Sequence, residues 1–148
     1  MQLRNFQSYK SRHLSLATKV VWNYQPTAKQ LAAHKNPARY KLFGGAMGGA
    51  KSWWLCAEII KLSLQFPGNR GYLCRNIGLD LKKSTLITFE AVCPPGLIKN
   101  HYRDDRVIEL LNGSTILYGG LGGQEDLERI KSTEFGWFAI EEASETIE

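Results

Sequence analysis

One stretch of the chain has the residue types and spacing of a phosphate-binding loop. Residues 44–52 are rich in glycine and end in a lysine and a hydroxyl, Lys51 and Ser52. Glycines let backbone N–H groups turn inward around an anion without Cβ clashes. Lys51 can reach the β- and γ-phosphates of a nucleotide, and the Ser52 hydroxyl can bind Mg²⁺. The predicted nucleotide-binding residues of this loop are Gly45, Ala46, Met47, Gly48, Gly49, Ala50, Lys51 and Ser52.

The segments around the loop fit this interpretation. An apolar run predicts a strand at about residues 39–44, and a helix-length apolar run follows at residues 52–66. A strand, a glycine turn and a helix in this order place the helix N-terminus against the anion. The pattern G-x-x-x-x-G-K-[ST] fails at one position, where Ala50 replaces glycine. Alanine is tolerated there if the residue is helical and is not if its φ must be positive. The alternative is a glycine-rich turn with an incidental lysine.

A second group of residues near the end of the chain complements the loop. The apolar run at residues 137–140 predicts a buried strand, and it ends in Glu141 and Glu142. In open α/β folds, ligands bind at the carboxyl edge of the sheet. We therefore expect Glu141 to hold Mg²⁺ together with Ser52, and Glu142 to orient and deprotonate an attacking water. The alternative is an ordinary exposed strand end.

The remaining pattern predicts an α/β fold, with a mostly parallel sheet flanked by helices and a β-hairpin insertion. Thr27 can cap a short helix that ends at Asn36-Pro37. Apolar spacing predicts a parallel strand at residues 71–75 and a helix at about 80–93. Asn112-Gly113 between apolar runs predicts the hairpin. Residues 125–131 are a candidate short helix.

Composition sets broad limits on the protein. The chain has 148 residues, which is enough for one sizeable core, and no apolar run approaches ~18 uncharged residues. No membrane span or signal peptide is therefore expected. Cys56, Cys74 and Cys93 are odd in number and lack metal-ligand spacing, which predicts buried free thiols.

Charge is distributed unevenly along the chain. The net charge is +5, and no acidic residue precedes Glu58. We divide the chain into a basic N-terminal arm at residues 1–21 and a nucleotide-binding domain at residues 22–148. A basic opening segment favours a polyanionic partner such as nucleic acid, and the alternative is a solvated tail.

Taken together, these motifs resemble the ATPase part of the large terminase subunit of tailed bacteriophages, the motor that packages DNA. The resemblance rests on Pro26-x-x-x-Gln30, on residues 44–52, on the glycine-rich residues 121–131, and on Glu134-Phe135-Gly136 followed by residues 138–145. It covers the chain from about Trp22 to the end. It implies a P-loop NTPase fold in which residues 137–142 are the Walker B-type strand.

The resemblance also implies roles for single residues. Gln30 matches the glutamine that recognises adenine, and Trp22 or Tyr24 could stack nearby. Lys51 and Ser52 match the phosphate and magnesium residues, and Glu142 matches the catalytic carboxylate. Glu141 occupies a position where many members have aspartate.

A basic residue from a neighbouring subunit can complete the site in such motors. Arg129 and Lys131 lie shortly before the acidic strand, where the family can place that residue. Arg75, just after the second predicted strand, is a further candidate. Stabilisation of transition-state charge in this way can be worth ~10³ or more in rate.

The resemblance implies an ATPase that uses ATP and Mg²⁺ to drive double-stranded viral DNA into a procapsid. Implied partners are a homo-oligomeric ring of copies, double-stranded DNA, the small terminase subunit and the portal protein of the procapsid. The implied location is the host cytoplasm, with transient docking on the procapsid and absence from the mature virion.

The chain stops at Glu148, directly after the acidic motif. We therefore expect a fragment or truncated product that lacks further strands and the family's nuclease domain. Two other interpretations stay open: another P-loop DNA translocase or helicase, and a nucleotide-binding fragment that is inactive on its own.

Overall fold

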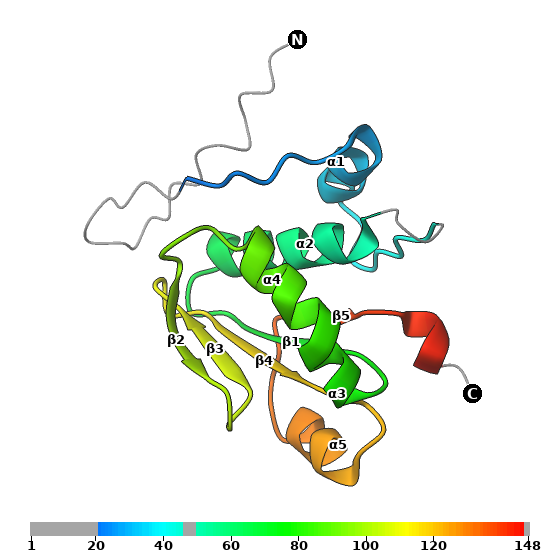
Figure 1. Ribbon diagram of the computed structural model, residues 1–148, viewed down its shortest axis with the longest axis vertical. Helices are drawn as coiled ribbons and strands as arrows, with labels where there is room; N and C mark the ends of the chain where they lie inside the picture. The colour runs from blue at the N-terminus through cyan, green and yellow to red at the C-terminus, as the bar shows by residue number, and fades with distance from the viewer. Residues whose placement is uncertain (1–20, 46–49, 147–148) are drawn as a thin grey trace.

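The computed structural model describes residues 21–45 and 50–146 (Figure 1). The basic arm predicted at the N-terminus therefore lies almost entirely outside the described residues. In chain order the elements are α1 (Ala28–Lys35), α2 (Lys51–Gln65), β1 (Arg70–Cys74), α3 (Gly78–Asp80), the π-helical turn η1 (Leu81–Thr85), α4 (Leu86–Val92), β2 (Ile98–Tyr102), β3 (Val107–Leu110), β4 (Thr115–Gly119), α5 (Gln124–Lys131), β5 (Trp137–Ile140) and the 3₁₀ helix η2 (Ala143–Thr146).

The protein is an α/β structure with a five-stranded sheet in the order β2-β3-β4-β1-β5. β1 pairs in parallel with β4 and with β5, whereas β2, β3 and β4 pair antiparallel. The α/β class and the parallel pairing of β1 are as predicted. The sheet is mixed rather than mostly parallel, because β2 adds an antiparallel pairing that the sequence analysis did not predict. Its central residues, Lys99, Asn100 and His101, are polar and hide the strand pattern.

The core lies between the sheet and the helices α2 and α4, which cover one of its faces (Figure 1). Leu73 and Ala139 project into this core from β1 and β5. On the other face, the ring of Tyr72 stacks on that of Phe138 at a centroid distance of 5.4 Å. At Gly71, a Cβ atom would lie 1.9 Å from the indole of Trp137, so the close approach of β5 to β1 requires a glycine there.

The local signals for the helices and the hairpin are confirmed. Thr27 and Gln30 form a reciprocal capping box at the start of α1. The predicted helix at about 80–93 is a continuous segment from α3 to α4, interrupted by the π-helical turn η1. β3 and β4 form the hairpin around Asn112-Gly113. None of the helices in the described part of the chain is long and apolar enough to cross a membrane.

The predicted strand at residues 39–44 is wrong, because this segment forms no strand. Tyr40 and Leu42 are 84% and 91% exposed, so the apolar run is not buried. Two contacts tie the segment to α2 instead: the Lys41 ammonium donates to the carboxylate of Glu58 at 2.8 Å, and the ring of Phe43 stacks on that of Trp54. Among the described residues, no strand pairs with the outer edge of β5.

Candidate functional site

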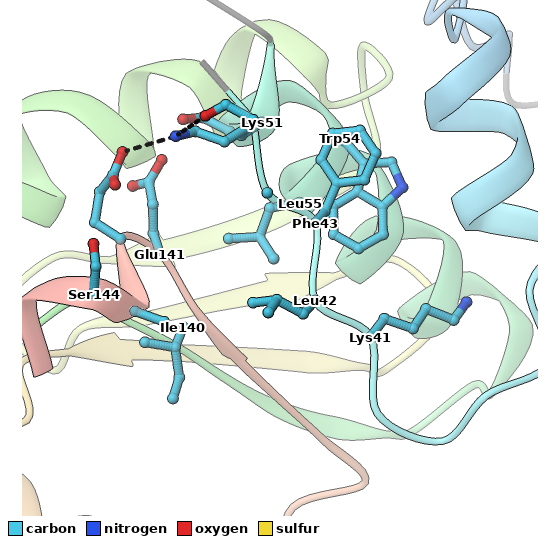
Figure 2. Close-up of a pocket in the computed structure, with 14 residues that line it drawn as sticks. Lys41, Leu42, Phe43, Lys51, Trp54, Leu55, Ile140, Glu141 and Ser144 are labelled. Atoms are coloured by element: carbon cyan, nitrogen blue, oxygen red, sulfur yellow. Dashed lines mark hydrogen bonds and ion pairs between the residues drawn. The ribbon is translucent and has the colours of Figure 1, made fainter. Parts of the chain in front are cut away.

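A pocket of about 290 Å³ opens between three parts of the chain that the sequence analysis singled out (Figure 2). They are the segment before the glycine-rich loop, the first turn of α2, and the residues that follow β5. The lining residues are Lys41, Leu42, Phe43, Gly44, Gly45, Lys51, Ser52, Trp54, Leu55, Ile140, Glu141, Glu142, Ala143 and Ser144. Predicted phosphate-binding and acidic residues therefore share one cavity.

Lys51 lines this pocket, with its ammonium between two oxygen atoms (Figure 2). Its Nζ donates to the carbonyl of Gly45 at 3.3 Å and lies 3.9 Å from Oε1 of Glu142. The side chains of Lys51 and Glu142 are 31% and 38% exposed, and ion pairs in such settings contribute only ~0–1 kcal/mol. An incoming anion can therefore displace the carboxylate from the ammonium at little cost.

Ser52 and Glu141 meet inside the pocket. The backbone N–H of Glu141 donates to the carbonyl of Cys74 at 2.8 Å, which extends the β1–β5 pairing and fixes the residue at the carboxyl edge of the sheet. Burial raises the pKa of Glu141, and its hydrogen bond with Ser52 opposes that rise. A hydroxyl and a carboxylate are hard oxygen donors of the kind that Mg²⁺ prefers, so this pair fits the ion.

Glu142 has a strained backbone, with φ at 49°. This left-handed conformation costs a non-glycine residue of order 1–3 kcal/mol, and such strain clusters at functional sites. It turns the chain from β5 into η2, where the N–H of Glu145 donates to the carbonyl of Glu142 at 2.9 Å. Arg75 holds this turn in place through two hydrogen bonds to the Glu145 carboxylate, of 2.9 and 2.6 Å. Arg75 is thus already paired within its own chain.

Ala50 precedes Lys51 at the N-cap of α2 and is not helical. Its φ is 50° and its ψ is 35°, the left-handed region in which alanine is unfavourable. The condition under which alanine would replace glycine without strain is therefore not met. The loop residues Ala46, Met47, Gly48 and Gly49 lie outside the described residues, so their predicted role stays a prediction.

Gln30 lies beside the end of the loop rather than in the pocket. Its side chain is buried, and its Oε1 accepts a hydrogen bond from the N–H of Thr27 at 2.8 Å. Its Nε2 donates to the carbonyl of Ala50 at 3.0 Å. Gln30 therefore links α1 to the start of α2, and adenine recognition by this residue stays a prediction.

The two aromatic residues expected to stack near a base do not line the pocket. Trp22 is buried in the core, and its indole N–H donates to the carbonyl of Val92 at 2.7 Å, so a stacking role for Trp22 stays a prediction. The hydroxyl of Tyr24 lies 3.1 Å from Nε2 of His34. The aromatic pair at the pocket is Phe43 and Trp54, whose stacked rings are 4.7 Å apart (Figure 2). The sequence marks these two residues only by their positions, because Phe43 precedes the loop and Trp54 follows it.

Arg129 does not join Lys51 in this pocket. It lies on α5, and its guanidinium donates to the carbonyl of Asp105 at 2.6 Å. Lys131 ends the same helix and is exposed. The role expected of Arg129 in the site of a neighbouring subunit stays a prediction.

Thr85 also belongs to this region, and no motif of the sequence predicted it. Its hydroxyl donates to Oε2 of Glu141, and its side chain is fully buried. A lone threonine within a helical pattern carries no signal for such a contact. Comparisons of the chain with protein-family models, with curated proteins and with solved structures found no match.

Proposed function

We propose that this protein binds ATP with Mg²⁺ in the pocket of Figure 2 and hydrolyses it, as a P-loop NTPase. The observation that carries the proposal is the convergence of Lys51, Ser52, Glu141 and Glu142 on one cavity, with the Lys51 ammonium 3.9 Å from the Glu142 carboxylate. A cation, a hydroxyl and two carboxylates at the carboxyl edge of a sheet are the groups that phosphoryl transfer requires.

In the first step of the proposed reaction, Lys51 exchanges the Glu142 carboxylate for the phosphates of ATP. The ammonium leaves Glu142 and binds phosphate oxygens, helped by the N-terminus of α2 behind it. Ser52 and Glu141 would hold Mg²⁺, which neutralises charge on the phosphates. The released Glu142 accepts a proton from a water that attacks the γ-phosphorus. The bond to the β–γ bridging oxygen breaks, and ADP and phosphate leave.

We further propose that this hydrolysis serves DNA packaging, as in the ATPase part of a large terminase subunit. The support is the resemblance of the motifs, together with the absence of acidic residues before Glu58 in the sequence. Double-stranded DNA, a ring of copies, the small terminase subunit and the portal protein follow as proposed partners. Salt-sensitive, non-specific DNA binding is the expected signature of the basic arm.

A second candidate is a nucleotide-binding module without turnover. One observation favours it: the strained backbone of Ala50, directly before Lys51. The same pocket would then bind ATP, and the chain would be stabilised by it without releasing phosphate.

Substitution of Glu142 tests its catalytic role, and phosphate release by the parental chain separates the two candidates. Glu142→Gln removes the proton acceptor and leaves Lys51 and Ser52 in place. We expect ATP affinity to stay within a few-fold of the parental value. Phosphate release should fall by ~10²-fold or more, the usual contribution of a general base. The measurements are fluorescent ATP-analogue binding and a phosphate-release assay on the full chain, with and without DNA.

The control for this experiment is Glu134→Gln, the same chemical change at an exposed residue outside the pocket. It should leave binding and turnover unchanged. Turnover of Glu142→Gln at the parental rate would contradict the assignment of Glu142. ATP binding by the parental chain without any phosphate release would favour the binding module.

A further inference from the structure

Thr85 makes a hydrogen bond unlike those of three other hydroxyl residues within the helical segments of this protein. The hydroxyls of Ser63, Ser84 and Thr88 donate to carbonyls four residues earlier in their own helices, at 2.8, 2.8 and 3.3 Å. That is the usual arrangement for a hydroxyl within a helix. Thr85 instead donates across the core to Oε2 of Glu141, 56 residues further along the chain.

The hydrogen bond between Thr85 and Glu141 lies in a buried part of the protein. Thr85 has no exposed surface and Glu141 is 8% exposed, so water has little access to the bond between them. A carboxylate in such a setting requires hydrogen-bond donors, because burial without them is costly. Thr85 and Ser52 are the donors that the Glu141 side chain meets among the described residues, one from each of two separate helical segments.

The local helix geometry explains how Thr85 comes to face Glu141. Thr85 is the last residue of the π-helical turn η1, which interrupts the segment from α3 to α4. A π turn holds one residue more than an α turn, so the side chains within it do not follow the spacing of an α-helix. Such turns occur frequently at functional sites. Here the last residue of the turn, Thr85, donates its hydrogen bond to Glu141.

We propose that Thr85 is a positioning residue, which fixes the Glu141 carboxylate in the orientation that receives Mg²⁺ beside Ser52. The inference rests on the proposed function of the pocket. A carboxylate has about four lone-pair sites, so Oε2 can accept from Thr85 while a site remains for the ion. Partners that orient a metal ligand in this way typically contribute 10–100-fold to metal affinity.

The test compares Thr85→Val, which removes the hydroxyl at nearly constant shape, with Thr85→Ser, which keeps it. The readout is the Mg²⁺ concentration that half-saturates binding of a fluorescent ATP analogue to the full chain. We expect this midpoint to rise about tenfold or more in Thr85→Val and less than about threefold in Thr85→Ser. Binding of the analogue without Mg²⁺ should not change. Thr88→Val, on the same helical segment, should match the parental chain.

A double substitution tests whether Thr85 acts through Glu141. In a Glu141→Gln background, Thr85→Val should cause no further rise of the midpoint, because the carboxylate that it orients is gone. A further rise of the same size would show that Thr85 acts elsewhere and would overturn the proposal. An unchanged midpoint in Thr85→Val alone would overturn it as well.

Two outcomes keep the proposal separate from other failures. If Thr85→Val does not fold by circular dichroism, Thr85→Ala takes its place, and equal Mg²⁺ midpoints for alanine and serine would overturn the inference. If the parental chain does not bind the analogue with Mg²⁺ at all, the proposed function fails, and this inference fails with it. Normal parental binding with an unaffected Thr85→Val refutes the role of Thr85 alone.

Discussion

Two residues of the candidate site have left-handed backbones, and they differ in what that conformation does. Glu142, with φ at 49°, is held by the turn into η2 and by the pairing of Arg75 with Glu145. Its strain turns the chain so that the Glu142 carboxylate lies near Lys51. Ala50, with φ at 50°, has no side-chain capping bond. Its methyl group contributes strain at the point where α2 must begin.

Replacement of Ala50 by glycine should therefore stabilise the protein. A left-handed backbone costs an L-residue ~1–2 kcal/mol, and glycine avoids this cost. The greater freedom of glycine in the unfolded chain offsets ~0.4–1 kcal/mol of the gain. We expect Ala50→Gly to raise the free energy of unfolding by roughly 0.5–1 kcal/mol, measured by urea denaturation.

The matched control for this change is Ala32→Gly. Ala32 is an exposed residue inside α1, where glycine should cost ~1 kcal/mol. The two substitutions are chemically identical and should have opposite signs. Destabilisation by Ala50→Gly of the same size as that by Ala32→Gly would contradict the left-handed assignment.

At the scale of elements, a buried charge cluster joins α1, the segment before the loop and α2. Glu58 of α2 accepts hydrogen bonds from His34, from Lys41 at 2.8 Å and from Lys61 at 2.7 Å. Burial would raise the pKa of Glu58, but these three partners together lower it to about 2. The cluster fixes the segment that enters the loop, and with it one wall of the pocket.

This cluster predicts a specific loss of stability in acid. The pKa of Glu58 is lower in the folded state, about 2, than its ordinary value of 4.5. Its contribution is therefore complete above pH ~4.5 and is lost as the pH falls toward ~2. We expect Glu58→Gln to lower the free energy of unfolding by ~3 kcal/mol at pH 7, because it leaves buried cations without their carboxylate.

The measurement is urea denaturation of Glu58→Gln and the parental chain at several pH values between 3 and 7. The difference between the two should shrink as the pH falls, since the parental chain loses what the variant already lacks. Glu134→Gln, which removes a surface charge, should follow the parental curve. A difference that stays constant across this range would show that Glu58 does not contribute through its charge.

At the scale of the whole molecule, local patterns predicted most of the elements. The helix cap at Thr27, the Asn112-Gly113 turn and the apolar run of β5 each depend on neighbours in sequence, so each could be predicted directly. The strand predicted at residues 39–44 failed for a non-local reason. No strand pairs with this segment among the described residues, and contacts with α2 through Lys41 and Phe43 hold it instead.

In the candidate site, too, residues that belong to local motifs were predicted, and residues that depend on distant partners were not. The motifs predicted Lys51, Ser52, Glu141 and Glu142 as site residues, because phosphate chemistry demands those residue types at fixed spacing. The structure places these four residues around one pocket. Thr85 and Glu58 were not identified, because their importance comes from partners elsewhere in the fold. A threonine or glutamate within a helical pattern has no sequence mark that tells which side chain it will meet.

The central claim is that the pocket of Figure 2 binds the phosphates of ATP through Lys51. The most direct test is calorimetric titration of ATP with Mg²⁺ into the full chain, Lys51→Ala and the surface control Lys83→Ala. The claim predicts that the parental chain and Lys83→Ala bind alike. Lys51→Ala should bind ~10–100-fold more weakly, the value of one charge-assisted contact. Equal binding by Lys51→Ala, or no binding by the parental chain, would contradict it.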